Sequence, residues 1–381
     1  MSRVPSGSTS VLFVLNNARF FVTHRLRLAE GVRDAGFSVE VALPFTDDYV
    51  DRVTERGFVV HDSAIDQQGL NIFRELSTFV GLYRLYRRER PDIVHHVTVK
   101  PVLYGSLAAR LAGVPRVVNA ISGLGTLFSV GGVSGRLLSA VAWAAYGLAL
   151  RHPCMRLIFQ NEEDRGAFLR AGIVPERYCV LIPGSGVELE KHVVVPEPAG
   201  VPVVLLAARL LREKGVYEFV AAARQLREEG INARFVISGD TASNRKAVDQ
   251  SELDGWRDEG IVELTGWVSD MPALIAASTI VCLPSYYKEG VPKALLEASA
   301  GGRPIVTTDV PGCRDAVEHG VTGIVVPPRD LPALTAALRL LLSDAALRTQ
   351  MGEAGRRRAE ARFDVRQVVS STVALYKSMD P

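Results

Sequence analysis

Cysteine is scarce in this chain, which has only four among its 381 residues. The four lie far apart and form no C-x-x-C pair, so the sequence indicates neither a zinc ribbon nor a disulfide framework. Reduced thiols in a cytoplasmic protein are therefore expected at Cys154, Cys179, Cys282 and Cys313.

Long apolar segments are also scarce. The first ten residues, MSRVPSGSTS, lack the apolar core of a signal peptide. The longest apolar run, residues 137–150, is shorter than the ~20 residues that a membrane-spanning helix needs. Because Arg136 and Arg151 flank this run, we interpret it as a buried helix, with an interfacial helix as the alternative.

A strong net charge is missing as well. The formal charge is +2, which excludes the strongly basic character of nucleic-acid-binding domains. The basic residues are nevertheless uneven, since residues 74–156 contain eleven of them and only three acids. This segment indicates either an anionic membrane surface or lipid-phosphate partner, or simply solvated helix faces.

The length of the chain exceeds the ~250–300 residues at which a single core stops growing, so two domains are expected. Apolar strands alternate with amphipathic helices, which predicts parallel sheets covered on both faces. In the first half the strands are expected at 11–15, 38–43, 92–97 and 116–122, and the helices at 23–35, 73–90 and 104–112. The polar-aromatic segment NNARFF (16–21) is expected to be a loop.

The same alternation restarts after a proline-containing linker at 192–202. Strands are expected at 201–208, 233–238, 279–285 and 304–309, and helices at 216–229 and 292–300. We therefore predict an α/β protein with two doubly wound, Rossmann-like domains that face a cleft. They comprise residues 1–195 and 196–363, and a final helix over 364–381 crosses back to the first domain.

Two glutamates follow the strand at 279–285. Glu289 and Gly290 lie in the loop, Pro292 stands where the next helix begins, and Glu297 lies on that helix. The free amides of such a helix start bind anions. The two carboxylates would be about 12 Å apart along a helix, which is too far for a hydrolase pair at ~5–9.5 Å. They fit two clamps on one elongated ligand better than two surface glutamates.

Two cations follow the first strand of the second series. Arg209 and Lys214 come directly after residues 201–208, at the expected carboxyl end of the sheet. A planar cation and a flexible one suit a diphosphate whose charge grows as a bond breaks. Solvated surface charges are the alternative, which the position after a strand disfavours.

The segments AARLLREKG and EGVPKALLEASAGGRPIVTTDVPGCRD resemble glycosyltransferase family 4, which has the GT-B fold. The resemblance implies that the first domain binds the acceptor and the second a nucleotide-sugar donor, with UDP preferred. It implies retention of anomeric configuration without metal or cofactor, and no D-x-D pair is present. The implied roles are donor-sugar binding by Glu289, ribose binding by Glu297 and diphosphate binding by Arg209 and Lys214. The amides of Gly290 and Val291 would contact the sugar or the phosphate, and nucleoside contacts are implied near Gly239, Asp240, Trp267 and Val268.

The first half departs from the commonest family pattern, because NNARFF replaces paired glycines and Ser122 replaces a histidine. NNARFFVTHR, HHVTVKP and SGLGTLF resemble a bacterial subgroup that builds surface polysaccharides on polyprenyl-diphosphate-linked sugars. The implied acceptor is a saccharide or lipid-linked saccharide, with His24, Arg25 and Lys100 as binding residues and a peripheral position at the inner face of the membrane. Of His95 and His96, one is expected to face the core.

Other functions remain open at this point. A nucleotide-sugar epimerase or a phosphorylase could use the same fold, although neither acid/base carboxylates at a sugar ring nor a pyridoxal-binding lysine is evident. A non-catalytic subunit that binds a nucleotide sugar is a further alternative, which Ser122 keeps open.

Overall fold

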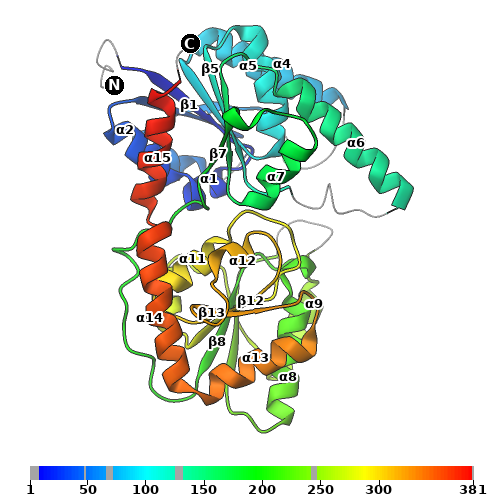
Figure 1. Ribbon diagram of the computed structural model, residues 1–381, viewed down its shortest axis with the longest axis vertical. Helices are drawn as coiled ribbons and strands as arrows, with labels where there is room; N and C mark the ends of the chain where they lie inside the picture. The colour runs from blue at the N-terminus through cyan, green and yellow to red at the C-terminus, as the bar shows by residue number, and fades with distance from the viewer. Residues whose placement is uncertain (1–7, 47–48, 66–71, 125–131, 242–246, 380–381) are drawn as a thin grey trace. The chain divides into compact units, whose positions relative to one another are not determined.

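The structure is a computed structural model that describes residues 8–46, 49–65, 72–124, 132–241 and 247–379. It divides into two compact units, residues 1–185 with 365–381, and residues 186–364. Each unit holds one parallel sheet with helices on both faces (Figure 1), which confirms the expected class of two doubly wound α/β domains. The units divide at 185/186, earlier in the chain than the 195/196 expected from the linker, and the final helix belongs to the first unit.

The first unit is built on a seven-stranded sheet in the order β3-β2-β1-β4-β5-β6-β7, and its neighbouring strands pair in parallel. The strands are β1 Ser10–Val14, β2 Ser38–Leu43, β3 Val59–Asp62, β4 Ile93–Val97, β5 Arg116–Ile121, β6 Met155–Phe159 and β7 Cys179–Leu181. The helices are α1 Ala18–His24, α2 Leu26–Asp34, α3 Val50–Thr54, α4 Ile72–Glu89, the π-helix η1 Pro101–Gly105, α5 Ser106–Ala112, α6 Gly132–Ala149, α7 Glu162–Arg170, the 3-10 helix η3 Glu176–Tyr178 and α15 Val365–Lys377.

The second unit is built on a six-stranded parallel sheet in the order β10-β9-β8-β11-β12-β13. The strands are β8 Val203–Ala207, β9 Arg234–Ser238, β10 Glu263–Gly266, β11 Ile280–Leu283, β12 Ile305–Thr308 and β13 Gly323–Val326. The helices are the 3-10 helix η4 Arg212–Lys214, α8 Val216–Glu228, α9 Gln250–Asp258, α10 Met271–Ala276, α11 Lys293–Ala300, α12 Cys313–Ala316, α13 Leu331–Ser343 and α14 Ala345–Arg362.

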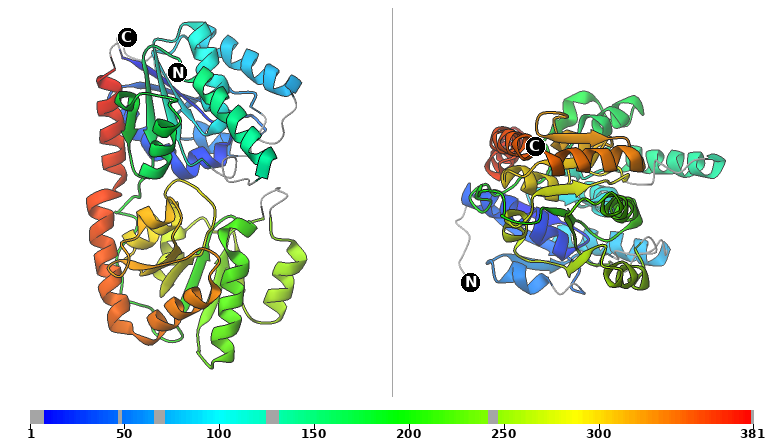
Figure 2. Two further views of the ribbon diagram at one scale, coloured as in Figure 1. Left: turned by 45° about the vertical axis from the view of Figure 1, so that its right-hand side comes forward. Right: turned by 90° about the horizontal axis from the view of Figure 1, so that it is seen from below.

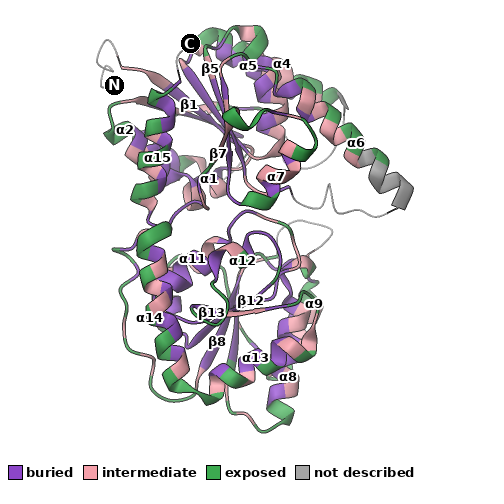
Figure 3. Ribbon diagram, in the orientation of Figure 1, coloured by how far each residue is buried: buried purple, intermediate pink, exposed green. Residues whose placement is uncertain are grey.

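The central strands of each sheet are buried on both faces, because alternate residues point to opposite sides and helices pack against each side. In β8, Val204 and Leu206 join the cluster formed with α8, α9 and α13, while Val203 and Leu205 join the one that contains residues of α11, α12 and α14. Strand β1 divides its residues between two clusters in the same way. The central strands are accordingly buried, the edge strands β3, β7 and β10 are partly exposed, and the helices turn exposed faces outward (Figure 3). The layers can be followed from two further directions in Figure 2.

The expectation of a loop at NNARFF was wrong. Helix α1 begins at Ala18, because the side chain of Asn17 caps it by accepting a hydrogen bond from the Phe20 amide at 2.6 Å. The helix expected over 23–35 is interrupted at Arg25, so it forms two helices, α1 and α2. Pro292 likewise caps α11 rather than forming its first residue.

The expectation of a buried helix over residues 137–150 was only partly right. Helix α6 buries Tyr146 and Ala149 but exposes Leu137, Val141 and Leu148 at 68%, 59% and 50%. No helix among the described residues has the length and apolar character to cross a membrane. Part of SGLGTLF, residues 125–128, lies outside the described residues.

Candidate functional site

The order of the second sheet reverses between β8 and β11, because the chain runs from β8 outward to β10 and then returns to β11. Ligands of open α/β sheets bind outside the carboxyl ends of the strands at such a point. Arg209 and Lys214 follow β8, and Glu289 follows β11. Three of the predicted site residues therefore lie where the topology places a ligand.

The two loops at this point are fastened to each other. The amide of Tyr286 donates to the carbonyl of Glu213 at 2.9 Å. Gly215 has φ +78°, and a Cβ there would lie 2.2 Å from the carbonyl oxygen of Pro284. Only glycine allows this close approach, so the loop after β8 is held directly against the end of β11.

Lys214 and Glu289 form an ion pair between these loops. Lys214 is only 6% exposed, and Oε1 of Glu289 also accepts a hydrogen bond from Ser285 at 3.4 Å. A pair with so little solvent around it interacts strongly. The structure thus brings together a cation and a carboxylate that the sequence predicted for the same ligand.

Tyr287 was not singled out from the sequence, yet it lies among these residues. Its ring centroid is 5.7 Å from Nζ of Lys214. Burial, together with the charge of Glu289, raises the pKa of its phenol, while Arg209 acts in the opposite direction. Arg209 itself is exposed, so its side chain is accessible to a ligand.

The loop with Glu289 and Gly290 rests on a second glycine. Gly312 has φ +83°, and a Cβ there would lie 2.2 Å from the Gly290 carbonyl oxygen and 2.6 Å from that of Glu289. Gly290 and Val291 are buried, and α11 starts two residues later at Lys293. The backbone before α11 therefore has a fixed path, as a preorganised anion site requires.

Glu297 is buried in the second turn of α11 and is 8% exposed. Burial raises the pKa of its carboxyl, and Glu188 adds to that effect, while Lys293 at 3.4 Å opposes it. Glu188 was not identified from the sequence, because nothing in the spacing of the two residues shows that they meet. A buried carboxylate of this kind is suited to accept hydrogen bonds from hydroxyl groups.

The residues predicted for the nucleoside follow β9 and β10 at the same edge. The amide of Gly239 donates to the Gly266 carbonyl at 2.9 Å, and that of Leu210 donates to the Asp240 carbonyl at 3.0 Å. Gly239 has φ +147°, and a Cβ there would lie 1.8 Å from the Ala208 carbonyl oxygen. Trp267 and Val268 follow β10, with Trp267 39% exposed.

In the first unit the sheet order reverses between β1 and β4. Arg25 lies beyond β1 and Ser122 beyond β5, and the guanidinium Nη2 is 3.4 Å from the Ser122 hydroxyl. Lys100 forms an ion pair with Glu75, with Nζ 2.7 Å from Oε1. His24 stacks on Phe20 with centroids 4.3 Å apart. The structure therefore brings Arg25 and Ser122 together and gives His24 and Lys100 partners of their own.

Both His95 and His96 are buried, although only one was expected to face the core. Nδ1 of His95 lies 2.5 Å from the Tyr376 hydroxyl, and Nε2 of His96 lies 2.9 Å from that of Tyr86. Burial lowers the pKa of both imidazoles, to about 4 for His96. They are neutral core residues because helices cover both faces of the sheet.

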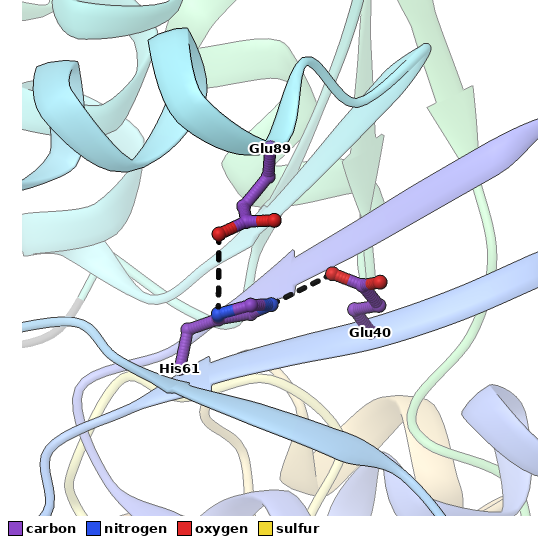
Figure 4. A group of neighbouring side chains, drawn as sticks. All are labelled: Glu40, His61 and Glu89. Atoms are coloured by element: carbon purple, nitrogen blue, oxygen red, sulfur yellow. Dashed lines mark hydrogen bonds and ion pairs between the residues drawn. The ribbon is translucent and has the colours of Figure 1, made fainter. Parts of the chain in front are cut away.

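One group with metal-ligand chemistry occurs within the described ranges, formed by Glu40, His61 and Glu89 of the first unit. Figure 4 shows the imidazole between the two carboxylates, with Nε2 facing Glu40 at 2.7 Å and Nδ1 facing Glu89 at 3.6 Å. The guanidinium of Arg88 also contacts Glu89. This group contains none of the residues predicted for catalysis.

Two family models match the chain. Residues 188–358 match "Glycosyl transferases group 1", and residues 10–158 match "Glycosyl transferase 4-like". The chain is 28% identical over 353 residues to the N,N'-diacetylbacillosaminyl-diphospho-undecaprenol alpha-1,3-N-acetylgalactosaminyltransferase of Campylobacter jejuni. This alignment covers 89% of this chain and 91% of that protein.

Further similarities agree with these matches. The chain is 27% identical over 295 residues to the UDP-Gal:alpha-D-GlcNAc-diphosphoundecaprenol alpha-1,3-galactosyltransferase of Escherichia coli, which covers 74% of each chain. Its fold is similar to that of Anabaena HepE in complex with UDP and glucose, with a TM-score of 0.79 at 19% identity, covering 97% of this chain and 99% of HepE.

Proposed function

The chain belongs to glycosyltransferase family 4, with the GT-B fold, and from this premise we propose that it transfers a sugar from UDP to a polyprenyl-diphosphate-linked saccharide, with retention and without a metal. The acceptor follows the chemistry named for the relatives from C. jejuni and E. coli. The product would be an intermediate of a surface polysaccharide, made at the inner face of the membrane.

The observation that carries the proposal is the set of charges at the β8/β11 edge. Arg209, Lys214 and the amides of Gly290 and Val291 would hold the donor diphosphate, and their stabilisation increases as negative charge develops on it. Glu289 would accept hydrogen bonds from the donor sugar. Lys214 therefore has two roles, since it neutralises Glu289 in the ligand-free protein and binds phosphate oxygens during catalysis.

The chemical step is a front-face displacement. The bond between the anomeric carbon and the β-phosphate oxygen breaks, and the acceptor hydroxyl oxygen forms the new bond from the same face. The hydroxyl proton passes to the departing phosphate oxygen. No side chain acts as a nucleophile in this step, so the protein contributes position and charge.

The remaining donor contacts would fix the nucleoside. Glu297 would bind the ribose hydroxyls, and its burial makes each such hydrogen bond strong. The exposed ring of Trp267 and the backbone at Val268 would contact the base, while Gly239 and Asp240 allow the chain to pass close to it.

On the acceptor side we propose that His24, Arg25 and Lys100 bind the saccharide or its lipid-linked diphosphate. Helix α4 adds a surface for an anionic membrane, because Phe73 and Leu76 are 80% and 59% exposed on a helix that also exposes Arg84 and Arg87. Co-sedimentation with vesicles that contain anionic lipid should therefore exceed that with neutral vesicles, and Phe73→Ser should reduce it.

Incubation with labelled UDP-sugars and a diphosphate-linked acceptor tests the proposal. We expect label on the acceptor, retained anomeric configuration by NMR, and unchanged rates in EDTA. Isomerised donor would identify an epimerase, and bound but unchanged donor would identify a non-catalytic subunit. Inversion at the anomeric carbon would refute the proposed mechanism while leaving the transfer intact.

A further inference from the structure

Arg25 differs from the other described cations of the first unit because it is buried without a counterion. It is 4% exposed, and its Nε has no hydrogen-bond partner. Its remaining contacts are long, at 3.3 Å from Nη1 to the His24 carbonyl and 3.4 Å from Nη2 to the Ser122 hydroxyl. No carboxylate pairs with it within the described ranges of the chain.

The groups around Arg25 are neutral. His95 and Tyr376 are its electrostatic neighbours, and His95 also has a buried ring nitrogen, Nε2, without a partner. Burial lowers the pKa of Arg25 to about 10, which Tyr376 partly offsets, so the guanidinium is still charged at neutral pH. The interior here holds a full positive charge that no carboxylate among the described residues neutralises.

Other buried arginines of this protein show what a structural arginine looks like. Arg348 donates to both carboxylate oxygens of Glu197, at 2.9 and 2.6 Å. Arg303 donates to four backbone carbonyls at 2.8 to 3.3 Å. The guanidinium groups of Arg348 and Arg303 therefore find their hydrogen-bond partners within the protein, whereas that of Arg25 has only two long contacts.

An unpaired charge in a protein interior is strongly unfavourable, so its presence indicates a partner that arrives from outside. A neutral saccharide would not compensate it, whereas a phosphate oxygen would. Ser122 is only half-buried, which gives a ligand access from the carboxyl end of β5. The donor diphosphate has its own cations, Arg209 and Lys214, in the second unit.

We propose that the guanidinium of Arg25, together with the Ser122 hydroxyl, binds the diphosphate of the lipid-linked acceptor. This inference rests on the proposed function and names the chemical group by which the enzyme recognises its acceptor. Recognition then depends mainly on the diphosphate and less on the terminal sugar. Ser122 adds a hydroxyl beside the guanidinium that can donate a hydrogen bond to a phosphate oxygen.

Direct binding of a short polyprenyl diphosphate tests the inference without requiring turnover. Farnesyl diphosphate is titrated calorimetrically into the full chain with UDP at saturation, so that the donor site is occupied. We expect it to bind the native protein, and Arg25→Gln to weaken binding about 30-fold or more, as loss of a buried charge contact does. Ser122→Ala should weaken it about fivefold.

Matched variants separate the possible causes. Arg27→Gln removes a neighbouring cation, in the first turn of α2, that is paired with Glu30 and whose side chain is 36% exposed, and it should leave binding unchanged. Arg25→Gln should unfold at the same or a higher temperature, because it removes an unpaired buried charge. The inference would be overturned if farnesyl diphosphate did not bind the native protein, or if it bound Arg25→Gln equally well. It would also be overturned if binding of farnesyl diphosphate were lost in Lys214→Ala and kept in Arg25→Gln. Failure of the proposed function would appear separately, as absent UDP binding.

Discussion

Replacement of Lys214 by methionine separates the structural from the catalytic role of the Lys214–Glu289 pair. Lys214 is 6% exposed and the side chain of Glu289 is 18% exposed, so the variant leaves the Glu289 carboxylate largely buried without its lysine counterion. Removing one partner of a buried ion pair lowers the free energy of unfolding by about 3–5 kcal/mol. Because Glu289 is still partly exposed, we expect the lower end of this range, about 3 kcal/mol. In a domain of this size that corresponds to a melting temperature lower by about 6–12 °C.

The double variant Lys214→Met with Glu289→Gln is the essential comparison. It removes both charges, so most of the lost stability should return and the melting temperature should lie within about 3 °C of the native value. Transfer activity should stay at least ~100-fold below native in both variants, because the diphosphate has lost Lys214 in each. Calorimetry and a transfer assay provide the two readouts. A single variant as stable as the native protein, or an active double variant, would refute the reasoning.

Three further predictions concern other parts of the molecule. The pKa of His96 falls from 6.5 to about 4 on folding, so its stabilising effect is present above pH 6.5 and is lost as the pH falls. His95 and His192 also have lowered pKa values, so the free energy of unfolding should drop between pH 7 and pH 5 in both proteins, and denaturant titration should show a drop about 2 kcal/mol smaller in His96→Gln than in the native protein. Gly312→Ala should lower kcat about tenfold or more by displacing the loop of Glu289, whereas Gly255→Ala, which meets no atom within 4 Å, should leave kcat unchanged. Glu297→Gln should raise KM for the donor about tenfold. It should also raise the melting temperature at pH 7, because burial raises the pKa of the Glu297 carboxyl, and the stability that the neutral carboxyl contributes at low pH is lost as the pH rises.

The sequence predicted the sheets well because fully buried parallel strands are continuous apolar runs. Strand β2 has the expected bounds, and β8 and β11 lie within the expected ranges. The positions of Arg209 and Glu289 followed from this, since residues after neighbouring parallel strands meet at one edge. These features depend on local patterns that a single sequence contains.

Features that depend on contacts between distant segments were missed. Tyr287 lies beside Lys214, and Glu188 influences Glu297 from a different part of the chain, yet no spacing rule relates these residues. The exposed face of α6 was missed because composition alone does not show which side of an apolar helix is covered. The start of α1, in contrast, depends on a local signal, because asparagine is a common helix-capping residue and Asn17 directly precedes the helix. The sequence therefore contained the information that predicts this helix start.

Calorimetric titration of UDP is the most direct test of the central claim, that the edge of the second sheet at β8 and β11 holds a nucleotide diphosphate. Arg209→Gln should weaken UDP binding about tenfold or more, because a charged hydrogen bond to phosphate is lost. Arg212→Gln, in the same segment and paired instead with Glu252, should bind UDP like the native protein. Equal affinity in all three proteins, or no affinity for UDP in any, would contradict the account.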